Sequence, residues 1–105
     1  MTVAMTGEQL ILSFTELRKA FEVALNHVEA TAGTGSAALD QDYFWSIPAE
    51  ELYDVYDVPV NMTIGQLSES WQHLRDSIAD PDRVLTYDLV WLADVLRAIG
   101  QSNPR

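Results

Sequence analysis

Apolar residues recur at steps of three and four in three separate segments of this 105-residue chain. The segments cover residues 7–30, 63–79 and 81–99. This spacing places apolar side chains on one face of an α-helix, and such a face has to be buried against another element. The sequence therefore predicts three long helices that pack together.

Residues that favour helix starts precede the segments. Thr6 is followed three positions later by Gln9, and Thr63 is followed in the same way by another Gln. In this spacing the two side chains can bond first-turn N–H groups that have no helical partner. Asp80 is followed by Pro81, which suits the first position of a helix. We expect helices to begin at these three places.

Glycines mark the expected helix ends. Gly33 and Gly35 follow the first segment, and Gly100 follows the last. Glycine ends helices because it adopts the left-handed backbone conformation of a C-terminal cap without a steric penalty. The small residues at 31–40 predict a flexible loop, and residues 101–105 are expected to form a frayed tail.

The stretch between the first two helices departs from the periodic pattern. Residues 40–60 contain Pro48, which suits the start of a short helix and is followed by two glutamates. The one β-like run, at 55–62, is interrupted by Pro59. The predicted fold class is therefore all-α. A single helical domain over residues 1–105 would form an up-down bundle of three long helices, with a short helix in the crossover.

The composition excludes several classes of protein. The chain has no cysteine, which excludes disulfides and Cys-based metal sites. It has 6 Lys and Arg against 16 Asp and Glu, a net charge of −10, whereas nucleic acids and anionic lipids attract basic surfaces. The N-terminus does not read as a signal peptide, and no stretch approaches the roughly 18 apolar residues of a membrane span. We expect a cytoplasmic protein that binds neither nucleic acid nor membranes.

Negative charge and aromatic side chains are concentrated between residues 40 and 57. This segment carries six carboxylates and no Lys or Arg. Aromatic side chains anchor many protein interfaces, and carboxylates steer and pair with basic partners. The segment therefore predicts binding to a basic protein. The candidate partner-binding residues are Asp40, Asp42, Tyr43, Trp45, Glu50, Glu51, Tyr53, Asp54, Tyr56 and Asp57.

The aromatic residues of this segment have a second interpretation. They can fill the core of the bundle while the carboxylates face water. The residues that would do so are Phe44, Trp45, Leu52 and Tyr56.

No pattern in the chain points to catalysis or to a cofactor. Ser70, His73 and Asp76 recur at steps of three, but such residues fan across a helix surface and nothing near them supplies an oxyanion hole. Residues 40–51 match a calcium loop at three acidic positions, yet Trp45 stands where that loop needs glycine. The sequence predicts a non-enzymatic protein with no catalytic residues, no metal and no cofactor.

Three pieces of the chain carry a family resemblance. They are Asp42-Tyr-Phe-Trp, then Glu51-Leu-Tyr-Asp-Val-Tyr with Pro59, and then Thr63-Ile-Gly-Gln-Leu-Ser-Glu-Ser-Trp71. Over residues 42–71 the chain resembles a family of small acidic bacterial proteins of uncharacterised function. It is also loosely similar in kind to bacterial immunity proteins, which are small, acidic and toxin-neutralising. The resemblance implies no catalytic residue. The family implies no established activity. From the charge and the aromatic residues of 40–57 we expect a protein that neutralises a basic protein, such as a toxin or nuclease.

The last segment suggests an alternative function. Its main stripe is joined by a second apolar row, so the helix is apolar around much of its circumference. Such a helix is central or meets a partner. The alternative is a homo-oligomeric structural or accessory protein, such as a homodimer, that pairs through this helix. The second row consists of Val84, Trp91 and Val95.

Overall fold

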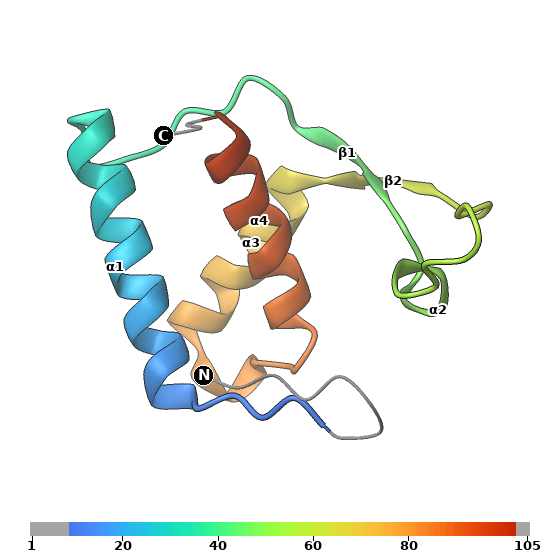
Figure 1. Ribbon diagram of the computed structural model, residues 1–105. Coiled ribbons are helices and arrows are strands. Elements are labelled where there is room, and N and C mark those ends of the chain that lie inside the picture. The colour runs from blue at the N-terminus through green and yellow to red at the C-terminus, as the bar shows by residue number, and fades with distance from the viewer. Residues whose placement is uncertain (1–8, 103–105) are drawn as a thin grey trace. The chain divides into compact units, whose positions relative to one another are not determined.

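The computed structural model describes residues 9–102 (Figure 1). The elements in chain order are helix α1 (Phe14–Ala32), strand β1 (Tyr43–Ser46), helix α2 (Ala49–Leu52), strand β2 (Thr63–Gln66), helix α3 (Leu67–Ala79), the 3-10 helix η1 (Pro81–Arg83) and helix α4 (Asp88–Ser102). The chain divides into two compact units, residues 1–37 and residues 38–105. The first contains α1 and the second contains all the other elements, and each is described by itself. The expected single domain stays a prediction.

The fold combines helices with a small sheet, so the prediction of an all-α bundle of three long helices is wrong. Strands β1 and β2 pair antiparallel, with Tyr43 opposite Gln66 and Ser46 opposite Thr63. Residues 63–66, expected to be the first turn of a helix, are therefore extended. The expected pair of capping side chains at Thr63 and Gln66 does not form, because α3 begins only at Leu67.

Gly65 allows the two strands to pack. It lies opposite Phe44 in the sheet, and the aromatic ring covers it so closely that a Cβ atom on Gly65 would lie 2.7 Å from Phe44 Cε2. A glycine in a strand often marks such a close approach. The pairing therefore depends on one ring and one glycine far apart in sequence, which local periodicity does not register.

Helix α1 begins later than the sequence predicts. Ser13 is the N-cap, and its Oγ accepts the main-chain N–H of Glu16 at 3.2 Å. Residues 9–13 are not helical, so the expected start at residue 7 is wrong, and Thr6 lies outside the described residues. This hydrogen bond satisfies one of the free N–H groups of the first turn and so fixes the start of the helix.

The predicted end of α1 at glycine is confirmed. Gly33 has φ of 71°, the left-handed conformation that favours glycine. Its N–H donates to the Glu29 carbonyl at 3.0 Å. Residues 31 and 32 belong to the helix, so the expected loop at 31–40 begins at Gly33.

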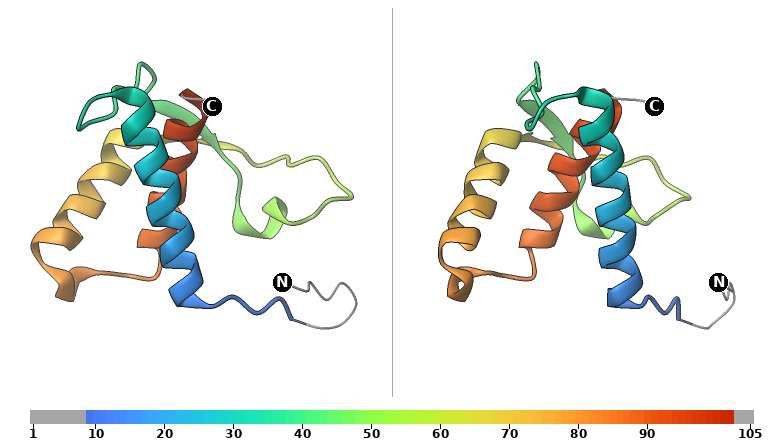
Figure 2. Two further views of the ribbon diagram at one scale, coloured as in Figure 1. Left: turned by 60° about the vertical axis from the view of Figure 1, so that its left-hand side comes forward. Right: turned by 90° about the vertical axis from the view of Figure 1, so that its left-hand side faces the viewer.

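Helices α3 and α4 pack against each other as an antiparallel pair (Figure 2). Asp80 caps η1 through its Oδ1, which accepts the N–H of Asp82 at 3.3 Å. Helix α4 begins only at Asp88 and continues through Gly100 to Ser102. The expected start at residue 81 is therefore wrong, as are the expected cap at Gly100 and fraying at residues 101 and 102.

Asp88 joins the start of α4 to α3. Its carboxylate is buried. Oδ1 accepts the N–H of Leu85 at 3.2 Å, and Oδ2 accepts the hydroxyl proton of Ser77. Nearby, the imidazole of His73 stacks on Trp91 with ring centroids 4.2 Å apart. The Asp88 carboxylate thus accepts a backbone N–H just before α4 and also links α4 to α3.

Large apolar side chains remain accessible over much of the described chain. Among residues 9–102, Leu74 is the one apolar residue that is buried, and it is still 9% exposed. Trp71 is 48% exposed and Leu89 is 66% exposed. Exposed apolar surface of this kind is typical of surfaces that meet a partner. No helix within residues 9–102 is both long enough and apolar enough to cross a membrane.

Candidate partner-binding surface

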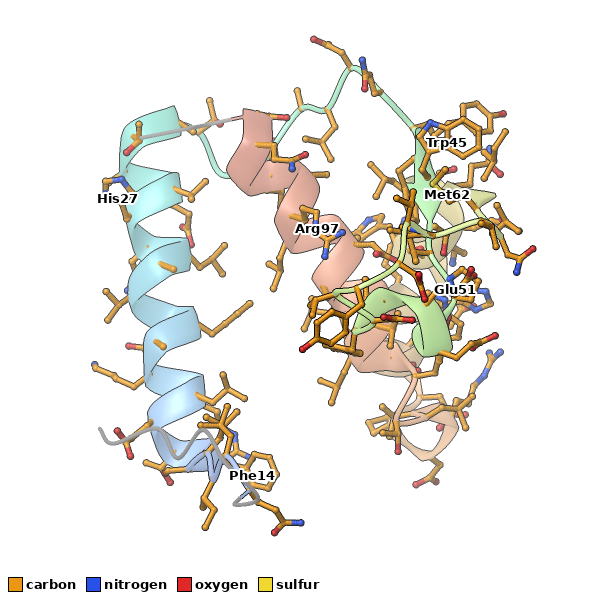
Figure 3. The ribbon with its side chains drawn as sticks, turned by 45° about the vertical axis from the view of Figure 1, so that its right-hand side comes forward. Phe14, His27, Trp45, Glu51, Met62 and Arg97 are labelled. Atoms are coloured by element: carbon orange, nitrogen blue, oxygen red, sulfur yellow. The ribbon has the colours of Figure 1, made fainter. Side chains whose placement is uncertain are left out.

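All the candidate partner-binding residues lie in the second unit. They belong to the stretch before β1, to β1 itself, and to α2 with the loop after it. Figure 3 shows Trp45 and Glu51 projecting from β1 and α2. Some of their carboxylates form hydrogen bonds within the fold, whereas others form none and are free to bind a partner.

The Asp42 carboxylate is engaged inside the fold. Its Oδ1 accepts the Ser68 N–H at 2.7 Å, and its Oδ2 accepts the Ser68 hydroxyl proton at 2.8 Å. The side-chain amide of Gln66 also donates to Oδ2, at 3.1 Å. The backbone N–H of Ser68 is the main reason that the pKa of the Asp42 carboxyl lies below its ordinary value of 3.8. Asp42 therefore caps α3, a role that the sequence analysis missed.

The aromatic side chains of the acidic segment lie at the surface. Trp45 is 66% exposed, Tyr53 is 83% exposed and Tyr56 is 94% exposed. The interpretation that Trp45, Leu52 and Tyr56 fill a core is therefore wrong. Phe44 is the member of that set that packs, over Gly65. Exposed aromatic residues among carboxylates are the arrangement expected of an interface.

Three carboxylates line a hollow of about 330 Å³ beside α2. They belong to Glu51, Asp54 and Asp57. Glu51 Oε1 accepts the Val60 N–H at 3.0 Å, whereas Glu51 Oε2 is enclosed and has no hydrogen-bond partner among the described residues. Asp54 Oδ1 accepts the Tyr56 N–H at 3.1 Å. The hollow therefore concentrates three carboxylates that form no ion pair within residues 9–102, and such a site favours a cationic side chain.

Three carboxylates of the segment, including Asp57 of the hollow, are not engaged within the fold. Asp40, Glu50 and Asp57 make no hydrogen bond or ion pair to any residue in the described range 9–102. Within the same range, no three His, Asp or Glu side chains are arranged to hold a metal ion. These free carboxylates are available to a binding partner.

A larger cavity of about 570 Å³ lies between β1 and the C-terminal half of α4. Asp94 and Arg97 line it from α4, and Figure 3 shows Arg97 projecting on the side of β1. Burial raises the pKa of the Asp94 carboxyl, while the positive charge of Arg97 acts in the opposite direction. The sequence analysis missed this cavity. Its opposite walls come from residues too far apart in the chain to form a motif.

The Ser70, His73 and Asp76 series does not form a catalytic arrangement. Ser70 is buried, and its hydroxyl donates to the carbonyl of the α3 N-cap residue, Gln66, at 3.4 Å. His73 stacks on Trp91. Asp76 accepts an amide N–H from the preceding turn at 3.0 Å. Each side chain is used separately within the helix pair.

Comparison with known proteins identifies no relative. No protein-family model matches the chain, and no curated protein or solved structure is significantly similar to it. The resemblance over residues 42–71 and the likeness to immunity proteins therefore stay predictions.

Proposed function

We propose that this chain is a non-enzymatic module that binds a basic protein, such as a toxin or nuclease, and thereby neutralises it. The observation that carries the proposal is the exposure of Trp45, Tyr53 and Tyr56 within the most acidic part of the chain. Burying one aromatic side chain at an interface removes about 150–250 Å² from water. At roughly 25 cal/mol per Å², this is worth about 4–6 kcal/mol before the costs of association.

The negative charges contribute more to the choice of partner than to the binding affinity. A basic partner is attracted over long range by a net charge of −10, which raises its association rate at low salt. At the surface, the Glu51, Asp54 and Asp57 hollow accepts a Lys or Arg side chain of the partner. A partner of the same sign is repelled, so the acidic segment also discriminates against most other proteins.

The test is capture of a partner at low salt with a charge-reversed variant. The variant Glu50→Lys, Asp54→Lys and Asp57→Lys changes the net charge by +6. A matched control, Glu22→Lys, Glu29→Lys and Asp82→Lys, makes the same change outside the segment. We expect wild type and control to retain one basic protein from a lysate, and the segment variant to lose it. Retention by the folded segment variant, or equal loss by both variants, contradicts the proposal.

A second candidate function is self-association through α4. Leu89 is 66% exposed and Val90 is 44% exposed, so apolar surface of α4 remains uncovered. Trp91, by contrast, packs within the molecule against His73 and Tyr87. The substitution Leu89→Glu is therefore expected to convert an oligomer to monomers without disturbing the helix pair. Light scattering that shows wild type to be monomeric at all concentrations rules this function out.

A further inference from the structure

The larger cavity lies along the edge of strand β1. Three consecutive residues, Tyr43, Phe44 and Trp45, all line it. Side chains of consecutive strand residues point to opposite faces of a sheet. A cavity bordered by all three therefore reaches the edge of the strand, and it extends as far as Leu67 at the start of α3. Within residues 9–102 the sheet has two strands, so no strand of the described chain lies beside this edge of β1.

The register identifies the main-chain groups at that edge. The Leu67 N–H donates to the Asp42 carbonyl at 2.7 Å, one step beyond the last strand pair. Hydrogen-bonded and non-hydrogen-bonded pairs alternate in an antiparallel sheet. Phe44 therefore bonds β2, whereas the N–H and C=O groups of Tyr43 and Trp45 point away from β2, and both residues line the cavity. These groups are a template for another strand.

The opposite wall of the cavity is charged. Asp94 and Arg97 line the cavity from α4, and Asp40 lines it from the stretch of chain that leads into β1. The two carboxylates outnumber the one guanidinium. A basic side chain of an incoming segment therefore meets favourable charge in the cavity, and the carboxylates of residues 40–57 attract the segment to the edge.

We propose that an extended basic segment of the partner adds to β1 as a third strand, bonding the main chain of Tyr43 and Trp45 and placing a Lys or Arg between Asp40 and Asp94. Strand addition gives affinity through the main chain and specificity through alternate side chains. This inference rests on the proposed function. It specifies the chemistry of the partner as an exposed, extensible segment with alternating basic residues.

The test uses two synthetic peptides of identical charge. The first is acetyl-(Lys-Val)₄-amide. The second carries N-methyl groups on one central Lys and one central Val, which removes a hydrogen-bond donor from each edge of the peptide. We expect the first peptide to slow amide hydrogen exchange at Tyr43 and Trp45 by at least about ten-fold, with little change at Phe44. We expect the second peptide to bind at least about ten-fold more weakly.

Several outcomes overturn strand addition. If both peptides bind equally and neither slows hydrogen exchange at Tyr43 and Trp45, strand addition is contradicted, while charge-driven binding still stands. Failure of the first peptide to bind at about 1 mM also contradicts strand addition. Failure of the proposed function has a different signature. The first peptide then protects both amides, but its affinity is unchanged by about 0.5 M NaCl or by the Glu50→Lys, Asp54→Lys and Asp57→Lys variant.

A substitution gives an independent check. Trp45→Pro removes the outward N–H as well as the indole, whereas Trp45→Ala removes only the indole. The outward position lacks a bond to β2, so proline there preserves the strand pair. We expect the proline variant to bind the first peptide at least about ten-fold more weakly than the alanine variant. If both variants have native circular dichroism and bind the peptide equally, the proposal is contradicted. If the proline variant unfolds, the hydrogen-exchange experiment on wild type tests strand addition instead.

Discussion

Asp42 caps helix α3 through Ser68, a residue 26 positions later in the chain. Its two carboxylate oxygens accept the main-chain N–H and the hydroxyl proton of Ser68 at 2.7 and 2.8 Å. This contact ties the acidic segment to the helix pair. One carboxylate of the segment therefore orients the surface on which the others are displayed.

Loss of this cap should destabilise the second unit. We expect Asp42→Ala to lower the thermal unfolding midpoint, because the first turn of α3 loses its acceptor. Asp40→Ala is the matched control, since Asp40 bonds nothing in the described chain. Thermal unfolding followed by circular dichroism measures both. Equal midpoints for the two variants would show that the cap contributes nothing.

The same contact predicts a response to acid. The hydrogen bonds from Ser68 place the folded-state pKa of Asp42 below its ordinary value of 3.8. The ionised carboxylate therefore adds stability above about pH 4, and this stability is lost as the pH falls through the folded-state pKa. Urea unfolding of wild type and Asp42→Asn between about pH 2 and pH 6 tests this. Wild type should lose its advantage over Asp42→Asn at the acid end, and a constant difference would contradict the assignment.

Asp94 should show the opposite pH dependence. Burial raises its pKa in the folded state, so ionising this carboxyl costs more in the folded chain than in the unfolded one. Its contribution to stability therefore falls as the pH rises from 3.8 through the folded-state pKa. Asp94→Asn should raise the unfolding midpoint at pH 7 and leave it unchanged below about pH 4. A lower midpoint at pH 7 would mean that its attraction to Arg97 outweighs burial.

Gly65 should tolerate no side chain. A Cβ at this position would meet the Phe44 ring 2.7 Å away at Cε2, so Gly65→Ala should cost about 1–3 kcal/mol of unfolding free energy. Gly100→Ala is the contrasting control, because nothing lies within 4 Å of its added Cβ in α4. That change should stabilise the chain by about 0.5–1 kcal/mol. Urea unfolding of both variants measures these changes, and equal effects would contradict the packing of Phe44 on Gly65.

Local signals predicted the parts of the fold that local interactions determine. The end of α1 at Gly33 and the short helix after Pro48 both follow from the backbone preferences of single residues. The start of α3 could not be predicted in this way. Thr63 and Gln66 have the spacing of a capping pair, but an aspartate from a distant part of the chain supplies the cap, and residues 63–66 pair with β1 instead.

The candidate surface was predictable in composition and not in geometry. The concentration of carboxylates and aromatic residues is visible in the sequence, whereas the exposure of Tyr56 and the engagement of Asp42 depend on the folded chain. The free edge of β1 could not be foreseen, because the strand itself depends on pairing with β2. The cavity wall that carries Asp94 could not be foreseen either, because α4 is distant from β1 in the sequence.

The most direct test of the central claim is the dissociation constant of the captured basic partner for three forms of the chain. Wild type is compared with the double variant Trp45→Ala and Tyr56→Ala, and with Trp71→Ala, which removes an exposed aromatic residue outside the acidic segment. Interface anchors typically contribute at least about 2 kcal/mol each. The two losses together are about 4 kcal/mol, so the double variant should bind at least about 500-fold more weakly, with Trp71→Ala close to wild type. Unchanged binding by the double variant, or an equal loss in Trp71→Ala, would contradict the account.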